Sequence, residues 1–387
     1  HRLEEQEFGE TIDARTLEDP LEYVDALRAR YRVPKLDGLP DFSGGLVGYF
    51  GFETIAWIEP KLKMADKPDY MDAPDALLLL SEEVAVFDNL KGRLYLIVHA
   101  DPAETQAYAK AQRRLDELVY RLRQSGRSYP DVLHPSLLDE ADFVSGFSEP
   151  EFTAAVEKAK DYIRAGDVFQ VVLSQRMSVP FRARPVDVYR ALRALNPSPY
   201  MYFLDLGSYQ VVGSSPEILV RAEQGKVTVR PIAGTRPRGN DAAHDLALEL
   251  ELLADGKECA EHLMLIDLGR NDVGRVSEPN TVTVPQRFII ERYSHVMHIV
   301  SEVQGRLKAG TGFAELFKAT FPAGTVSGAP KIRALEIIQE LEPSRRHIYS
   351  GAVGYINWWG DTDTAIAIRT AVIADGLLHV QAGAGIV

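Results

Sequence analysis

Short glycine-containing turns separate the apolar segments at the C-terminal end of this sequence. Three such segments follow one another: Ala352 to Trp358, Ala365 to Ile373, and Leu377 to Gln381. The turns between them contain Gly360-Asp361 and Ala374-Asp375-Gly376. Parallel neighbours need a crossover of a dozen or more residues, so strands joined this closely pair antiparallel. The sequence therefore predicts an α+β fold, with antiparallel β-sheets in a sandwich-like core and helices packed outside.

Apolar periodicity predicts the helices that cover these sheets. A stripe at helical spacing ends at a glycine or a polar residue in each of five segments: Asp101 to Ser125, Glu151 to Ala165, Val186 to Leu195, Asp241 to Leu268, and Lys331 to Leu341. Further strands are predicted over Val168 to Val179, Thr281 to Val284, and Phe288 to Glu302. The pattern divides the chain into residues 1–100, a helix and proline-containing connector over 101–149, and a main region over 150–387.

Composition limits the class of protein. The chain has 387 residues, 45% of them apolar, and a formal charge of −13, which disfavours nucleic-acid binding because that needs a basic face. No apolar run approaches the roughly 20 residues that cross a bilayer, and His1 to Asp13 is polar and acidic, so we expect no membrane and a cytoplasmic location. The single cysteine, Cys259, excludes an intrachain disulfide. We expect both ends, His1 and Val387, to be cut from a longer protein.

Two glutamates suggest a metal site. Glu258 and Glu261 are three residues apart in a predicted helix, so they share a face and can point at one hard cation such as Mg²⁺. Paired glutamates on a helix are more often a solvated stripe, and that alternative stays open.

Other motifs suggest recognition of an anion. His295 and His298 lie in a predicted strand on opposite faces, so one of them is a candidate acid or base, or simply a buried structural residue. The glycine-rich loop from Pro322 to Lys331 offers free backbone amides before a helix but is not a nucleotide P-loop. Four arginines are candidates for bidentate carboxylate recognition: Arg236, Arg238, Arg270 and Arg369. Together these features favour a magnesium-assisted enzyme that acts on a small carboxylate.

Six motifs in order resemble the chorismate-binding enzyme family. They are Gly213-Ser-Ser-Pro-Glu217, Pro231-Ile-Ala-Gly-Thr-Arg-Pro-Arg238, Glu261 to Asp272, Tyr293-Ser-His-Val-Met-His298, Ala323 to Lys331, and Gln381-Ala-Gly-Ala-Gly385. The resemblance covers about 150–387, and residues 1–100 resemble the remainder of the amino-terminal domain of anthranilate synthase component I. It implies the conversion of chorismate and ammonia to anthranilate and pyruvate, in tryptophan biosynthesis.

The resemblance also implies the site residues. Glu217 corresponds to the general acid, His298 to the histidine of pyruvate elimination, and Thr325 to a further catalytic position. The metal ligands of Mg²⁺ correspond to Glu258 and Glu261. The residues that match the substrate contacts are Gly234, Thr235, Tyr349, Arg369, Gly383, Ala384 and Gly385. A feedback site for tryptophan is matched by Pro199, Tyr200, Met201, Val353 and Tyr355.

Two positions separate this activity from related ones. Isochorismate and salicylate synthases carry a lysine where this chain has Gln170, and aminodeoxychorismate synthases commonly carry one at Ala233. Amination by free ammonia is therefore favoured. Because Cys259 lies on the proposed metal helix, we expect the glutaminase to be another chain, a glutamine amidotransferase subunit (component II) in a hetero-oligomer.

The pattern is incomplete in two places. Family members have further magnesium-ligating glutamates beyond the Gly-Ala-Gly run, and a Leu-Leu-Glu-Ser segment of the tryptophan site has no match here. A catalytically incomplete fragment of the enzyme is therefore one alternative. Aminodeoxychorismate or aminodeoxyisochorismate synthase is the other.

Overall fold

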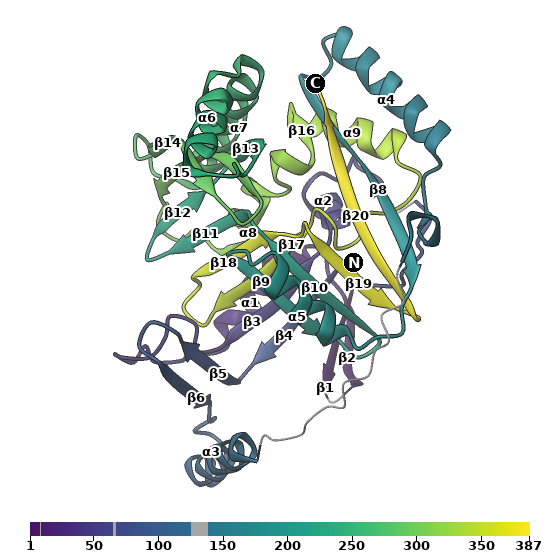
Figure 1. Ribbon diagram of the computed structural model, residues 1–387. Helices are drawn as coiled ribbons and strands as arrows, with labels where there is room; N and C mark the ends of the chain where they lie inside the picture. The colour runs from purple at the N-terminus through teal and green to yellow at the C-terminus, as the bar shows by residue number, and fades with distance from the viewer. Residues whose placement is uncertain (8, 65–66, 125–137) are drawn as a thin grey trace.

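The computed structural model describes residues 1–7, 9–64, 67–124 and 138–387. Two large β-sheets dominate it, and Figure 1 shows helices on the outer sides of both. Every pairing between the described strands is antiparallel. The predicted α+β fold with antiparallel sheets is confirmed.

The larger sheet has nine strands and joins the start of the chain to its last third. Its order is β13 (Ile232–Pro237), β15 (Val296–Arg306), β12 (Lys226–Val229), β11 (Ile218–Glu223), β18 (Thr362–Ile366), β17 (Ala352–Asn357), β3 (Gly45–Phe50) and β4 (Ala76–Ser81), with β14 (Thr283–Arg292) paired to β15. Since β3 pairs with β17, the first hundred residues share a sheet with the main region.

The second sheet has seven strands and is built around two long ones. Its order is β16 (Gly328–Ala329), β8 (Gln170–Pro180), β20 (Leu377–Ile386), β19 (Thr370–Ala374), β10 (Tyr209–Ser215) and β9 (Tyr200–Asp205), with β7 (Val144–Ser145) paired to β8. The long strands β8 and β20 run side by side for ten residue pairs, and Figure 1 shows them on the right. Two hairpins form small separate sheets: β1 (Arg2–Glu7) with β2 (Glu10–Thr16), and β5 (Glu83–Asp88) with β6 (Arg93–Val98).

Helices cover the sheets on several sides. They are α1 (Pro20–Ala29), α2 (Ile55–Ile58), α3 (Ala107–Arg123), α4 (Glu149–Arg164), α5 (Pro185–Leu195), α6 (Ala242–Ala254), α7 (Gly256–Val276), α8 (Phe313–Thr320) and α9 (Lys331–Leu341), with 3₁₀ turns η1 (Phe52–Thr54), η3 (Glu140–Asp142) and η4 (Gly324–Val326). Helix α7 packs on β13 and β15, whereas α9 packs on β8. None of the described helices is long and apolar enough to span a membrane.

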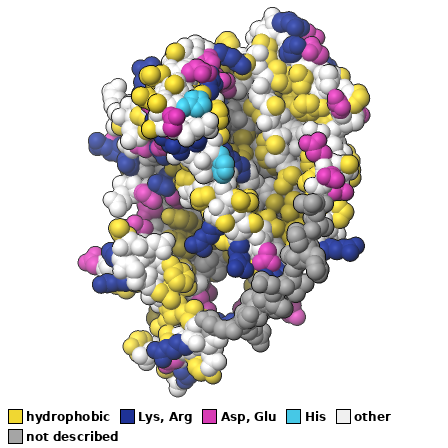
Figure 2. Space-filling model, viewed as in Figure 1, with side chains coloured by type: hydrophobic (Ala, Val, Ile, Leu, Met, Phe, Trp, Pro, Cys, Tyr) yellow, Lys and Arg dark blue, Asp and Glu magenta, His cyan; other side chains and the backbone are white. Residues whose placement is uncertain are grey.

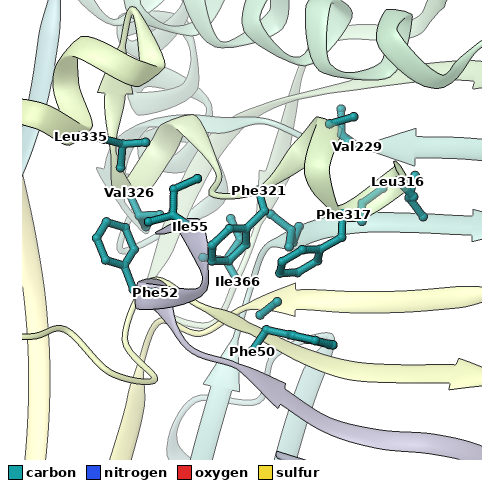
Figure 3. Packing of buried hydrophobic residues seen from close by; sticks show 14 of the residues in the cluster. Phe50, Phe52, Ile55, Val229, Leu316, Phe317, Phe321, Val326, Leu335 and Ile366 are labelled. Carbon is teal, nitrogen blue, oxygen red and sulfur yellow. The ribbon is translucent and has the colours of Figure 1, made fainter. Parts of the chain in front are cut away.

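The main hydrophobic core lies around α8, which is buried along most of its length. Phe313, Phe317 and Phe321 are four residues apart, so they form one stripe, and the last two rings stack at 4.5 Å. Phe50 of β3 lies 4.8 Å from Phe317, and Figure 3 shows these rings together with Ile366. Burial of each such ring contributes about 1.5–3 kcal/mol. The aromatic stripe thus fixes the amino-terminal strands against the main region.

Three predicted segments differ from the structure. The predicted helix Asp241 to Leu268 is two helices, because the Asp255 side chain caps a new helix by accepting the N–H groups of residues 257 and 258. The predicted strand Phe288 to Glu302 is a hairpin whose turn includes His295, so His295 does not lie opposite His298 in a strand. The predicted strand Ala365 to Ile373 is also divided, because the chain passes from β18 to β19 at Arg369, which has φ +50°. The predicted connector, 126–149, lies partly outside the described residues.

Side chains on the outer face have mixed character. Figure 2 shows Lys and Arg interspersed with Asp and Glu, and hydrophobic side chains gathered over the upper part of the molecule. Leu246, Leu250 and Leu253 of α6 belong to the exposed apolar side chains.

Candidate active site

The two glutamates proposed as metal ligands lie near the start of α7. Both are half-buried and face strands of different sheets. Glu258 Oε2 lies 3.3 Å from the point where a Cβ on Gly234 would stand, and Glu261 Oε1 accepts a hydrogen bond from Gln170 Nε2 at 2.9 Å. Helix α7 therefore connects β13 of the larger sheet to β8 of the other.

Glu258 and Glu261 can supply part of the coordination shell of Mg²⁺. Mg²⁺ is usually held by one or two carboxylates together with waters and substrate oxygens, which two half-buried glutamates can provide. Across residues 1–7, 9–64, 67–124 and 138–387, no cluster of three or more His, Cys, Asp or Glu could hold a metal ion by itself. A cation here would need oxygen ligands from a bound substrate.

A bulge in β13 brings the backbone next to His298. Gly234 has φ +68°, a conformation that glycine tolerates and other residues avoid, and the register with β15 shifts at this point. The Gly234 carbonyl lies 3.0 Å from His298 Nδ1, and Thr235 Oγ1 lies 3.1 Å from the same nitrogen.

This contact fixes the protonation of the imidazole. A carbonyl oxygen can only accept, so Nδ1–H of His298 donates and Nε2 keeps its lone pair. Burial lowers the pKa of His298, and the Arg369 charge lowers it further. The neutral His298 can therefore act as a base through Nε2.

Glu217 is the most strongly perturbed acid of the site. It lies between β10 and β11 and is 6% exposed. Burial raises the pKa of Glu217 to about 8, although the nearby Thr325 hydroxyl, the Ile232 N–H and the charge of Arg369 oppose the rise. Glu217 is therefore mostly protonated at neutral pH and can donate a proton.

A cavity of about 40 Å³ lies behind Glu217, between β11, α7 and η4. Glu217, Asp272, Thr320 and Thr325 contribute polar groups to its lining, which also contains Arg230 and several aliphatic side chains. The volume has room for one or more water molecules beside the carboxyl group.

The structure separates the four candidate arginines. Arg236 pairs with Glu251 at 2.8 Å and Asp255 at 2.9 Å, and Arg270 pairs with Asp267 at 3.0 Å. Arg369 is exposed and has no ion pair within the part of the chain that the structure describes. It acts electrostatically on Glu217 and His298, so these three residues lie near one another. Only Arg369 is left to bind a substrate carboxylate.

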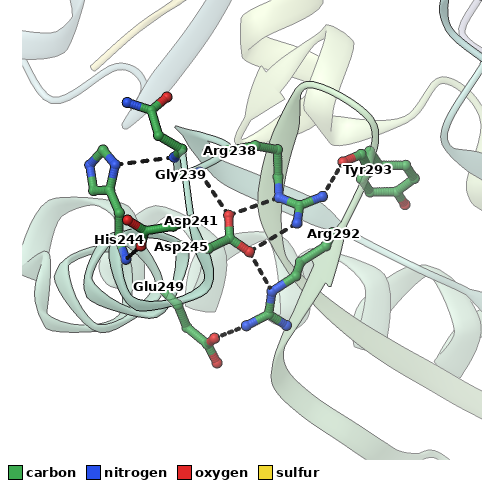
Figure 4. A network of polar contacts seen from close by, with 9 residues as sticks. Arg238, Gly239, Asp241, His244, Asp245, Glu249, Arg292 and Tyr293 are labelled. Carbon is green, nitrogen blue, oxygen red and sulfur yellow. Dashed lines mark hydrogen bonds and ion pairs between the residues drawn. The ribbon is translucent and has the colours of Figure 1, made fainter.

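Arg238 belongs to a structural network instead. Figure 4 shows Asp245 between Arg238 and Arg292, and the Arg238 pair is bidentate with both distances at 2.9 Å. Arg238 also donates to the Tyr293 carbonyl at 2.7 Å. The two arginines hold the pKa of Asp245 far below its usual range. This network fixes α6 against the end of β13 and the β14–β15 turn.

The glycine-rich end of the chain lies within a strand rather than after one. Gly383, Ala384 and Gly385 belong to β20 and pair with residues 172–174 of β8. A Cβ at Gly383 would stand 2.6 Å from the Tyr349 hydroxyl, and a Cβ at Gly385 would stand 2.9 Å from Gln170 Nε2. The glycines therefore allow Tyr349 and Gln170 to approach the backbone of β20 closely.

Buried ion pairs that the sequence did not single out support these residues. Lys331 Nζ lies 2.8 Å from Asp272 Oδ2 and also donates to the Thr320 carbonyl, which anchors the glycine-rich loop to α7. Arg346 is 1% exposed and bonds Glu342, beside Tyr349. Lys331 and Asp272 each lie in one of the six motifs, but their positions in the sequence do not predict that they form an ion pair.

The residues matched to a tryptophan site gather elsewhere, at β9 and β17. The Tyr200 hydroxyl donates to Asp363 at 2.7 Å and lies 2.8 Å from Arg221, and Tyr355 packs on Phe42 with ring centroids 4.5 Å apart. Val353 is buried in a hydrophobic cluster with Leu204 and Tyr209, whereas Pro199 is exposed and Met201 is half-buried in β9.

The fold and this arrangement define an α+β small-molecule site, with a protonated carboxylic acid, a neutral histidine and one unpaired arginine between two antiparallel sheets. Comparison with known proteins agrees. Residues 4–387 match the family model described as chorismate binding enzyme. Anthranilate synthase component 1 of Pseudomonas aeruginosa is 58% identical over 371 residues, 95% of this chain and 75% of the relative.

Solved structures give the same result. Anthranilate synthase component I from Streptococcus pneumoniae superposes with a TM-score of 0.86 and 42% identity, covering 98% of this chain and 82% of that one. The menaquinone-specific isochorismate synthase from Escherichia coli shares the fold, with a TM-score of 0.69 and 19% identity over 95% of this chain and 93% of that one. The chain belongs to the chorismate-binding enzyme family, in its anthranilate synthase component 1 branch.

Proposed function

We propose that this chain converts chorismate and ammonia to anthranilate and pyruvate. The observation that carries the proposal is the buried Glu217, whose pKa burial raises to about 8 despite the opposing charge of Arg369. A departing ring hydroxyl needs a proton, and Glu217 holds one at neutral pH. The high identity to proteins named anthranilate synthase component 1 supports the same reaction.

The steps follow from the side chains. Arg369 binds a carboxylate of the substrate, ammonia adds to the ring, and Glu217 protonates the leaving hydroxyl so that it departs as water. His298 Nε2 then takes the ring proton while the bond between the ring and the enolpyruvyl oxygen breaks, and the freed enol becomes pyruvate. Thr325 lines the same cavity as Glu217, and its hydroxyl favours the ionised form of the acid.

Glu258 and Glu261 would hold Mg²⁺ together with a substrate carboxylate. The cation would supply charge neutralisation for that carboxylate. Tyr349, Gly383 and Gly385 would contact the other end of the substrate along β20.

The ammonia would come from a second chain. The names of the relatives imply a further component, and Cys259, the only cysteine, lies on α7 beside the proposed metal ligands. We therefore propose that a glutamine amidotransferase subunit is the partner. We also propose that the protein acts in tryptophan biosynthesis in the cytoplasm, and that tryptophan binds near Tyr200 and Tyr355 as a feedback inhibitor.

The test is an assay of the purified protein with chorismate and Mg²⁺, supplied with either ammonium or glutamine. We expect a fluorescent aminobenzoate with ammonium and none with glutamine alone. Product from glutamine alone would overturn the proposed partner, and failure of ammonium to react would overturn the proposed activity.

A further inference from the structure

One face of the seven-stranded sheet carries polar side chains beyond the proposed site. Residues two apart on a strand share a face, so Ser174, Arg176 and Ser178 of β8 point the same way. On β20, Gln381 pairs with Arg176 in register and His379 pairs with Ser178. Gln381 Nε2 donates to Ser174 Oγ at 2.8 Å, and His379 Nδ1 lies 2.8 Å from Ser178 Oγ. Both cross-strand pairs are bonded, and Arg176 lies between them.

The Arg176 side chain is buried and, among the described residues, incompletely hydrogen-bonded. The residue is 8% exposed, and its Nη1 has no hydrogen-bond partner among the described residues. Its Cζ lies 5.2 Å from the centre of the Tyr70 ring. That contact supplies no hydrogen-bond acceptor.

Arg346, in the same region, shows how this fold satisfies a structural guanidinium. It makes five hydrogen bonds, two to Glu342, two to the carbonyls of Val326 and Val172, and one to Ser350 Oγ. Arg176 is buried like Arg346, but its guanidinium has none of these hydrogen-bond acceptors.

Asp69 and Glu53 favour the charged form of Arg176, but within the described residues neither forms an ion pair with it. The carboxylate of Asp69 already accepts from Arg345 Nη1 at 3.0 Å and lies 3.0 Å from His347 Nε2. Glu53, deeper inside, accepts the backbone N–H of Arg346 at 2.8 Å.

The two histidines nearby add no positive charge to that of Arg176. His347 and His379 are 5% and 7% exposed, and each is close enough to feel the charge of Arg176. Burial lowers the pKa of both, that of His347 to about 4, so both are neutral at pH 7. A neutral imidazole can still donate one N–H to an anion.

A guanidinium taken out of water without an anion is strongly unfavourable, which favours a bound partner. We propose that Arg176, with His347 and His379, binds a small oxyanion, a phosphate or a carboxylate, beneath the Tyr70 ring. The planar guanidinium matches two oxygens of either group. Tyr70 is 63% exposed, so its ring separates Arg176 from solvent on that side. This site does not depend on the function proposed above.

The test is thermal unfolding of the intact chain, titrated with sodium phosphate, with sodium acetate, or with sodium chloride at matched ionic strength. A ligand that binds only the folded state raises the melting temperature saturably. We expect such a rise with phosphate or acetate and none with chloride, and the anion that saturates identifies the ligand class. Equal shifts with all three salts would overturn the site.

Arg176→Met keeps the length of the side chain and removes its charge. Affinity for the anion should fall by about 10–100-fold, the worth of a charge-assisted hydrogen bond. Arg190→Met on α5, where the side chain is 71% exposed, is the matched control and should leave the affinity unchanged. In chloride, Arg176→Met should be at least as stable as the parent, because no ion pair or side-chain hydrogen bond among the described residues is lost.

A large loss of stability of Arg176→Met in chloride would contradict the proposal, since it would mean that the guanidinium already has its partner. His379→Gln is a second variant that retains hydrogen bonding to Ser178. It should weaken anion binding several-fold, and unaltered binding in both variants would overturn the site.

Discussion

Replacing Glu217 by glutamine keeps the shape of the side chain and removes the proton that it can release. The acid is 6% exposed, and burial raises its pKa to about 8. With that pKa, roughly nine-tenths of the molecules carry the proton at pH 7 and roughly one-tenth at pH 9. If Glu217 is the general acid, kcat/KM should fall about tenfold across this range.

The assay measures kcat/KM for chorismate from pH 6 to 9.5, with total ammonium adjusted so that free ammonia stays constant. Glu217→Gln should lower the rate by about 10²–10⁴-fold and remove the alkaline decline. Glu278→Gln, where the side chain is 42% exposed, is the matched control and should keep both the rate and the pH profile.

Stability gives an independent measurement. The folded-state pKa of Glu217 is raised, so its contribution to stability is fully present below the ordinary pKa of a glutamate and is lost as the pH rises through about 8. The parent protein should therefore lose more stability than Glu217→Gln between pH 5 and 9. An alkaline decline that persists unchanged in Glu217→Gln would refute the assignment of that pKa to Glu217.

Three further substitutions test other parts of the site. His298→Met should slow pyruvate release by about 10²–10⁴-fold while amination continues, so the aminated intermediate should accumulate by chromatography; equal loss of both steps in a less stable protein would indicate a structural role. Gly234→Ala should lower stability by about 1–2 kcal/mol, because φ is +68° and the new Cβ would stand 3.1 Å from Leu252, whereas Gly310→Ala, at φ +84° with open space, measures the backbone cost alone. Glu261→Gln should raise the magnesium concentration for half-maximal activity by about 10–100-fold. An unchanged magnesium dependence would mean that Glu261 is a solvated surface residue and not a metal ligand.

Local sequence patterns predicted most of the helices and strands, but they predicted few of the pairings between strands. The helix Lys331 to Leu341 has the bounds that its apolar stripe predicts, and the predicted strand Val168 to Val179 corresponds to β8 within two residues at each end. The division at Asp255 was missed because the apolar spacing continues across both helices, although aspartate before Gly256 is a capping signal. The pairing of β3 with β17 joins residues about three hundred apart, and no local pattern encodes it.

The sequence predicted the main residues of the candidate site, but it did not predict the ion pairs that surround them. The motifs named Glu217, His298 and Arg369, which the fold brings together from three separate segments. Spacing could not show that Arg236 and Arg238 are occupied by acidic partners, because those pairs depend on where α6 packs. The pair between Arg270 and Asp267 is local, three residues apart on α7, and spacing alone could have indicated it. The incompletely hydrogen-bonded Arg176 is visible only once β8 and β20 are placed side by side.

The identity of the product tests the central claim most directly. With ¹⁵N-labelled ammonium, Mg²⁺ and chorismate, NMR should show ¹⁵N bound to an aromatic ring carbon next to the one that bears the carboxylate, and one pyruvate for each aminobenzoate. A para-aminated ring that retains its enolpyruvyl group, or isochorismate without ¹⁵N, would contradict the account.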